Sequence, residues 1–275
     1  MNCSLLIVVP TLNSHALLPR LVTSLQQQTW PHWQLLFIDG PSNRPHRQWL
    51  QQCCSLEHRC RWVEQDPSQP GIYGAMNQGF VAAADPTCPA DWLLFWGSDD
   101  WAASPTVLAE AMEALGTSIR PLADTSQQWP DLLVCGGRYA NAAQGSLGRV
   151  AAFQPPGLLA SSTYRRALLL GSTPPHQATL FGPGARRRLA QYAPGFRLAA
   201  DLDYFLQLSN DPDLLVQCLD LELVHMDTGG ISGKQTQLRL QEVRHAYRRA
   251  FGWIWWFPFL NRYIKRFASL LERNR

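Results

Sequence analysis

The segment Asp91-Trp92-Leu93-Leu94-Phe95-Trp96-Gly97-Ser98-Asp99-Asp100-Trp101 carries the most informative pattern in the chain. Its apolar run is typical of a buried strand, and it leads through a short turn into two adjacent carboxylates. Open α/β sheets bind ligands at such carboxyl-terminal strand ends. Two carboxylates that a turn brings together repel each other unless a cation lies between them, and hard oxygen ligands suit Mg²⁺ or Mn²⁺. In the alternative interpretation, Asp99 and Asp100 only favour the dipole of the helix that Ser104-Pro105 signals.

The composition is that of a globular protein, because 46% of the 275 residues are hydrophobic and 16% are charged. This length accommodates one large α/β domain, or one domain with an appendage. The seven cysteines are odd in number and have no C-x-x-C spacing, so we expect free thiols in a reducing compartment. Residues 1–10 lack a basic start and are too short to span a membrane, so we expect a first strand and a cytoplasmic protein.

Strand-like and helix-like runs alternate through the first half of the chain. We expect strands at 4–9, 34–38, 60–64 and 92–96, and helices at about 14–28, after the second strand, at 71–84 and at 105–115. Asn13 or Ser14 would cap the first helix. This order predicts a mainly parallel sheet with right-handed crossovers. Beyond about residue 130 we expect shorter, mixed strands at 132–135, 138–140, 149–153 and 177–181.

The turn after the first strand excludes two nucleotide-binding classes. Residues 10–14 contain neither G-x-G-x-x-G nor G-x-x-x-x-G-K-[ST], which argues against a dinucleotide dehydrogenase and a P-loop NTPase. Polar side chains nevertheless follow each predicted parallel strand: Thr11 and Asn13, Asp39, Asp66, then Asp99 and Asp100. A nucleotide across these ends would meet an acid for its base or ribose, and its diphosphate would need a cation to approach the carboxylate pair.

Four segments occur here in the order seen in family 2 glycosyltransferases: Val8-Val9-Pro10-Thr11-Leu12-Asn13, Ile38-Asp39-Gly40-Pro41-Ser42, Gly71-Ile72-Tyr73-Gly74-Ala75-Met76-Asn77-Gln78-Gly79 and Trp96-Gly97-Ser98-Asp99-Asp100. The chain resembles the bacterial polysaccharide-assembly branch of that family, well over residues 5–101 and more loosely over 174–233. The resemblance implies a GT-A fold, which is an α/β fold with a mainly parallel central sheet and helices on both faces.

The resemblance also implies a reaction, the inverting transfer of a sugar from a nucleotide diphosphate to an acceptor hydroxyl. Thr11 would lie beside the nucleotide and Asp39 would contact its base or ribose, with UDP favoured by family frequency. Asp99 and Asp100 match the acidic motif that binds Mn²⁺ or Mg²⁺, with Asp100 as the direct ligand. Asp201 falls where the family carries its catalytic base, and residues 229–232 resemble a loop near the donor phosphates.

Several of these residues have a structural alternative. Asp39 could cap a turn, and Asp201 and Asp203 could be charges at a helix N-terminus. His225 could contact metal or phosphate, although, like His176, it is more simply a structural histidine. We expect Asn77 to hold a loop or helix together.

Departures from the family pattern leave other activities open. Gly74, Arg44 and Ala200 stand where relatives often carry acids, and residues 85–91 look like an insertion. One alternative is nucleotidyl transfer to a sugar phosphate, although residues 10–14 lack the usual glycine-rich basic loop. The other is a catalytically silent subunit of a polysaccharide-assembly complex.

The C-terminal part of the chain is basic and aromatic. Residues 244–275 carry a net charge of +7, which leaves −4 on the rest of a chain whose net charge is +3. Tryptophans and phenylalanines cluster between these charges at 251–260. We therefore divide the chain into a catalytic domain at 1–233 and a helical appendage at 234–275. The appendage either packs on the core or binds the inner surface of an anionic membrane, where a lipid-linked acceptor would be found. Nucleic acid is not expected, because nothing else is basic enough.

Overall fold

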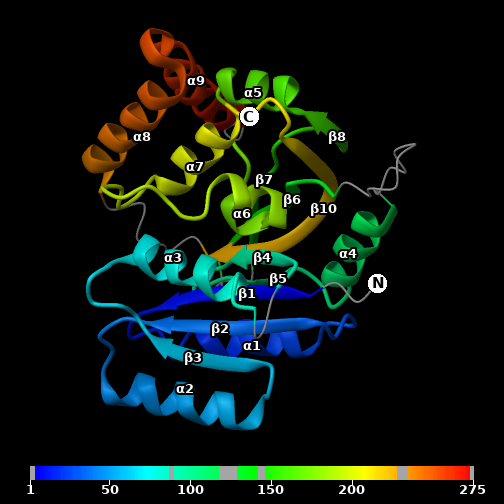
Figure 1. Ribbon diagram of the computed structural model, residues 1–275, viewed down its shortest axis with the longest axis vertical. Helices are drawn as coiled ribbons and strands as arrows, with labels where there is room; N and C mark the ends of the chain where they lie inside the picture. The colour runs from blue at the N-terminus through cyan, green and yellow to red at the C-terminus, as the bar shows by residue number, and fades with distance from the viewer. Residues whose placement is uncertain (1–3, 87–89, 118–128, 142–145, 228–234, 273–275) are drawn as a thin grey trace.

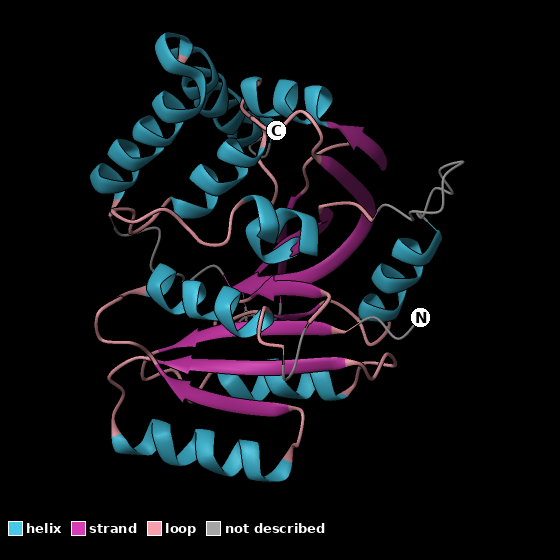
Figure 2. Ribbon diagram, viewed as in Figure 1, coloured by secondary structure: helices cyan, strands magenta, loops and turns pink. Residues whose placement is uncertain are grey.

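The computed structural model describes residues 4–86, 90–117, 129–141, 146–227 and 235–272, with side chains up to residue 264. The first half forms four parallel strands in the order β3-β2-β1-β4. These strands are β1 (Leu5–Thr11), β2 (Trp33–Asp39), β3 (Cys60–Glu64) and β4 (Trp92–Phe95). Figure 2 shows the ends of β1, β2 and β3 at one edge of the sheet.

Helices cover both faces of this sheet (Figure 1). They are α1 (Leu18–Gln26), α2 (Arg44–Leu56), α3 (Ile72–Ala83) and α4 (Val107–Thr117). On one face, Met76 and Phe80 of α3 pack against Val8. On the other face, Leu21 of α1 and Leu108 of α4 share a core with alternate residues of the same strands. Strands buried on both sides are expected to be largely apolar, as β1, β2 and β4 are, whereas β3 at the edge of the sheet is partly exposed and carries Arg61 and Glu64.

The second half extends the same sheet with mixed strands, in the order β4-β9-β6-β10-β5. The elements are β5 (Trp101–Ala102), β6 (Leu132–Asn141), β7 (Ser146–Ala151), β8 (Gly157–Ala160), β9 (Thr179–Phe181) and β10 (Leu215–Asp227). They alternate with α5 (Ser161–Leu169), α6 (Pro183–Arg188) and α7 (Ala200–Leu208). β6 and β10 are parallel, whereas β9 is antiparallel to both of its neighbours.

Two local predictions were wrong. Helix α1 begins at Leu18, and its N-cap Leu17 has no side-chain cap, so neither Asn13 nor Ser14 caps it. Asn13 instead has a left-handed backbone with φ of 54°, a conformation that asparagine tolerates in turns. The two strands predicted at 132–135 and 138–140 are one strand, β6, because the glycines between them continue the ladder with β10.

The C-terminal helices α8 (Thr236–Phe251) and α9 (Trp256–Glu272) lie next to α5 and α7, at the end of the molecule opposite α2 (Figure 1). Val243 and Tyr247 of α8 belong to the core cluster that contains α7. The predicted boundary at 233/234 lies outside the described residues. Pro258 lies in the first turn of α9, where its missing N–H costs no helical hydrogen bond. In the described part of the chain, no helix is both long and apolar enough to cross a membrane.

The cysteine prediction is confirmed for the five described thiols, which are all free: Cys53, Cys54, Cys60, Cys135 and Cys218. Cys135 and Cys218 are buried in strands, and burial raises the pKa of both thiols. Cys3 and Cys88 lie outside the described residues.

Candidate active site

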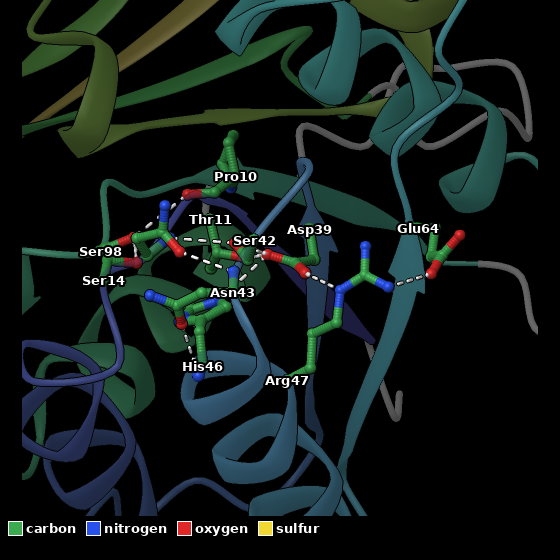
Figure 3. A network of polar contacts seen from close by, with 11 residues as sticks. Pro10, Thr11, Ser14, Asp39, Ser42, Asn43, His46, Arg47, Glu64 and Ser98 are labelled. Atoms are coloured by element: carbon green, nitrogen blue, oxygen red, sulfur yellow. Dashed lines mark hydrogen bonds and ion pairs between the residues drawn. The ribbon is translucent and has the colours of Figure 1, made fainter.

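The last residues of three parallel strands lie side by side at one edge of the sheet. Thr11 is in register with Asp39, and Asp39 is in register with Glu64. The guanidinium of Arg47 bridges the two acids, with its Nη1 2.8 Å from Glu64 and its Nε 3.7 Å from Asp39 (Figure 3). Thr11 and Asp39, predicted at two separate strand ends, therefore lie side by side, and Arg47 joins Asp39 to Glu64.

Asp39 is buried, with 1% of its surface exposed, and its two oxygens differ. Oδ1 accepts hydrogen bonds from Thr11 Oγ1 at 3.0 Å and Ser42 Oγ at 2.6 Å, and lies 3.0 Å from His46 Nε2. Burial lowers the pKa of His46, so this imidazole is neutral at pH 7. Oδ2 accepts no hydrogen bond within the described residues. A buried acceptor in this state is suited to a ligand that brings an N–H or O–H group.

Asn13 and Ser14 join three loops. Asn13 accepts a hydrogen bond from the Asn43 backbone N–H at 2.8 Å and donates its own N–H to Ser42 Oγ at 3.0 Å. Ser14 Oγ donates to Ser98 Oγ at 2.9 Å, and Ser98 Oγ donates to the Pro10 carbonyl at 3.1 Å. The loop that carries the acid pair is thereby fixed to the loops after β1 and β2 (Figure 3).

The acid pair lies directly after β4. Asp100 is buried, and its Oδ2 accepts the Gly97 N–H at 2.5 Å. Burial raises the pKa of Asp99 and, well above its ordinary value, that of Asp100, and the charge of Asp227 raises both further. No ion pair reaches Asp99 or Asp100 from the described residues. Two adjacent acids whose charged forms are disfavoured by burial, and which have no cationic partner among the described residues, form a site that a bound cation would stabilise.

The other predicted ligands are spread around this edge. His225 is paired with Glu222, Nε2 to Oε1 at 2.8 Å, and its ring lies edge-on to Trp101 at 5.5 Å. Asp66 accepts the Ser68 N–H at 2.8 Å, and the side chain of Ser68, followed by this backbone bond, lowers the pKa of Asp66. Among the described residues, no three Asp, Glu, His or Cys side chains form a metal site by themselves. Residues 229–232, predicted near the donor phosphates, lie outside the described residues.

Asp201 and Asp203 point to different partners. Asp201, in the first turn of α7, accepts a hydrogen bond from the hydroxyl of Tyr73 in α3 at 2.9 Å. Burial, and then the charge of Asp201, raise the pKa of Tyr73 well above its ordinary value, so Tyr73 keeps its proton. Asp203 is buried and pairs with Arg249 of α8, Oδ2 to Nη1 at 2.5 Å.

An aromatic group supports the Asp201 side of the site. His176 Nε2 lies 2.6 Å from the hydroxyl of Tyr192, and the ring of Tyr192 lies 5.2 Å from that of Tyr73. Burial lowers the pKa of His176. Asn77 binds the backbone of Tyr192 twice, accepting its N–H at 2.7 Å and donating to its carbonyl at 3.3 Å. This confirms the prediction that Asn77 holds a loop in place.

Sequence reasoning missed several residues of the site. Tyr73 and Tyr192 were not predicted as partners of the acids, and Arg47 was not predicted at the strand ends. Tyr73 lies within one of the segments that carry the family resemblance, so its place in that segment could have indicated that it belongs to the site. Asp227, at the end of β10, was not predicted either.

The sheet, with its strand-end acids and the acidic turn after β4, has the arrangement of the GT-A fold. Residues 6–120 match the family described as glycosyl transferase family 2. The PGL/p-HBAD biosynthesis glycosyltransferase of Mycobacterium tuberculosis is 26% identical over 227 residues, 82% of this chain and 78% of the relative.

Solved structures establish the fold. Residues 1–349 of S. aureus TarS in complex with UDP align with a TM-score of 0.63 at 14% identity; the alignment covers 90% of this chain and 66% of that TarS fragment, slightly under two thirds. Glucosyl-3-phosphoglycerate synthase from Mycobacterium tuberculosis, in complex with Mn²⁺, UDP and phosphoglyceric acid, aligns with a TM-score of 0.58 at 14% identity, covering 91% and 79%. The GT-A fold predicted from the sequence is confirmed.

Proposed function

We propose that this protein is an inverting glycosyltransferase that moves a sugar, in the manner of a hexosyltransferase, from a nucleotide diphosphate to an acceptor hydroxyl. The assembly of a polysaccharide or glycolipid is the setting we favour. The observation that carries the proposal is the Asp99–Asp100 pair. Asp100 is buried, neither acid has a cationic partner among the described residues, and Ser98 joins the pair to the polar edge around Asp39. The relatives named for glycosyl transfer support the same conclusion.

The nucleotide is proposed to bind across Thr11, Asn13, Asp39 and Asp66. Asp39 Oδ2, buried and without a hydrogen bond among the described residues, would accept an N–H of the base or an O–H of the ribose. A UDP-sugar is favoured because TarS was solved with UDP and with UDP-GlcNAc. PcManGT was solved with GDP-Man and Mn²⁺, so the donor base needs a direct test.

The residues of the acid pair fit a divalent cation. Asp99 and Asp100 would hold Mn²⁺ or Mg²⁺, with His225 as a further candidate ligand. Because no three described side chains form a complete metal site, the donor diphosphate would supply the remaining oxygens, as is usual for these ions. When bound, the cation offsets the charge that develops on the departing diphosphate.

Asp201 is proposed as the base. Its carboxylate would take the proton of the acceptor hydroxyl as the hydroxyl oxygen attacks the anomeric carbon and the bond to the diphosphate breaks. Attack from the face opposite the leaving group inverts the configuration at that carbon. Tyr73, which donates to Asp201 Oδ1, would orient the carboxylate for this step.

The acceptor is proposed to be a saccharide or a lipid-linked saccharide at the inner surface of an anionic membrane. Trp253 is 84% exposed, and Trp256, Phe257, Leu260 and Ile264 are also exposed, whereas Trp255 and Phe259 pack against the core. Between residues 235 and 264 the only acid is Glu242, against five arginines. An exposed aromatic surface with this charge suits anionic headgroups.

A thermal-shift panel tests the donor assignment. UDP-, GDP-, dTDP- and CMP-sugars are compared with and without Mn²⁺, because a ligand that binds only the folded state raises its stability. We expect one nucleotide series to raise the melting temperature in a Mn²⁺-dependent manner, and Asp39→Asn to weaken that effect. Hydrolysis of the donor without acceptor then separates an enzyme from a silent assembly subunit. If no sugar nucleotide shifts the melting temperature, the proposal is wrong.

A further inference from the structure

A carboxylate from α8 holds the chain just before the helix that carries Asp201. Glu242 accepts three backbone N–H groups: that of Arg197 at 2.9 Å on Oε1, and those of Leu198 at 2.7 Å and Ala199 at 2.9 Å on Oε2. The residue is buried, with 7% of its surface exposed. Three donors on one buried carboxylate fix the path of the backbone that they belong to.

Helix α7 has no cap of its own at this end. Its N-cap residue is Ala199, which has no side-chain hydrogen bond to offer. Glu242, on a different helix, accepts the N–H of this N-cap residue and those of the two residues before it. A negative charge at this position also favours the helix dipole of α7.

The same face of α8 makes two further contacts with this segment. His245 and Arg249 follow Glu242 at spacings of three and seven, which places all three on one side of the helix. The ring of His245 lies 5.5 Å from that of Phe196, and the guanidinium of Arg249 lies 5.8 Å from the centre of the Phe196 ring. Arg249 also pairs with Asp203. Contacts with α8 therefore hold both ends of the segment 196–203, at Phe196 and at Asp203.

We infer that Glu242 is a positioning residue for Asp201, an inference that rests on the proposed role of Asp201 as the base. Tyr73 fixes the carboxylate of Asp201 from α3, and Glu242 fixes its backbone from α8. Glu242 does not touch the reacting groups, because both of its oxygens are used by backbone N–H groups. Its effect on the reaction passes through the first turn of α7.

The positioning role differs from that of a simple helix cap in one measurable respect. Loss of a cap lowers stability and leaves the chemistry of the folded enzyme intact. Loss of a positioning residue lowers kcat in protein that is still folded, since a small displacement of a catalytic group costs up to about 100-fold in rate. The KM of the donor should not change in either case, because the donor site lies at the strand ends of the other half.

Glu242→Gln tests this in the full-length protein. The amide has one acceptor oxygen in place of two, so at least one of the three N–H groups loses its partner. We expect kcat to fall about 10- to 100-fold at a temperature where the variant is folded, with the donor KM within about two-fold of wild type. Glu242→Asp, which keeps the charge on a shorter side chain, should restore part of the lost kcat. Wild-type kcat in folded Glu242→Gln would overturn the inference, and Glu242→Asp serves as the test variant if Glu242→Gln does not fold.

A double-mutant cycle separates this inference from the proposed function. If Glu242 acts through Asp201, adding Glu242→Gln to Asp201→Asn should change kcat by less than about two-fold. If the reductions in kcat of the two single variants multiply in the double variant, Glu242 does not position Asp201. The assignment of Asp201 as the base is not affected by that result. If Asp201→Asn alone keeps wild-type kcat, the base assignment is wrong and the inference fails with it.

Discussion

The hydroxyl of Tyr73 donates a hydrogen bond of 2.9 Å to Asp201 Oδ1, across 128 residues of sequence. This bond connects α3 of the first half of the chain to α7 of the second half. Removing it with Tyr73→Phe leaves the ring contact with Tyr192 in place and frees the carboxylate to rotate. We expect kcat to fall about 10-fold, the rate equivalent of roughly 1.4 kcal/mol, with donor affinity unchanged. Steady-state kinetics and donor titration measure both quantities, and an unchanged kcat would show that Tyr73 does not orient Asp201.

Asp99→Ala or Asp100→Ala should abolish metal-dependent donor binding. In wild-type protein, donor and Mn²⁺ at about 100 times their dissociation constant should add roughly 2.7 kcal/mol of stability, and the variants should gain none of it. Asp100→Asn keeps an acceptor for the Gly97 N–H and removes a buried charge, so without metal its melting temperature should rise by about 2–4 °C. Full Mn²⁺-dependent activity in either alanine variant would show that the pair does not bind the metal and only favours the dipole of the helix that follows.

His176 should make stability depend on pH. Burial lowers its pKa below the ordinary value of 6.5, so the folded state resists protonation and the unfolded state does not. Stability from this residue is therefore present above pH 6.5 and is lost as the pH falls through 6.5 toward the folded pKa. The difference in unfolding free energy between wild type and His176→Phe should be constant above pH 7 and should shift in favour of the variant below 6.5. Denaturant unfolding at several pH values measures it, and parallel curves at all pH values would contradict it.

The membrane proposal predicts which side chains matter. Truncation from Phe251 would remove buried core, so point substitutions are the sharper test. The combined variant Trp253→Ser, Trp256→Ser and Ile264→Ser should lose binding to vesicles that contain anionic lipid, at low salt, with the melting temperature preserved. Leu56→Ser provides the control, since Leu56 is 80% exposed on α2 at the other end of the molecule. If wild type ignores such vesicles, or if the variant binds as well as wild type, this surface does not bind membrane.

The sequence predicted the first half of the fold closely, because β1, β2 and β4 are largely apolar runs bounded by turn residues. β3 has the predicted bounds, and the ends of β1, β2 and β4 differ by one or two residues. The two-residue strand β5 was missed, because it is defined by its pairing with β10 and has no pattern of its own. The acids of the site were recognised from local motifs. Their partners Tyr73, Arg249 and Glu242 were not, since helix-to-helix contacts between distant segments leave no trace in residue spacing.

The central claim is that Asp201 acts on the acceptor and does not bind the donor. The most direct measurement compares Asp201→Asn with Asp203→Asn in one assay of donor affinity and turnover. Asp203 pairs with Arg249 away from Tyr73, so its substitution should affect stability more than turnover. We predict that Asp201→Asn keeps wild-type donor affinity while turnover falls by roughly 10²–10⁴-fold. Wild-type turnover in Asp201→Asn, or a large loss in Asp203→Asn alone, would contradict the account.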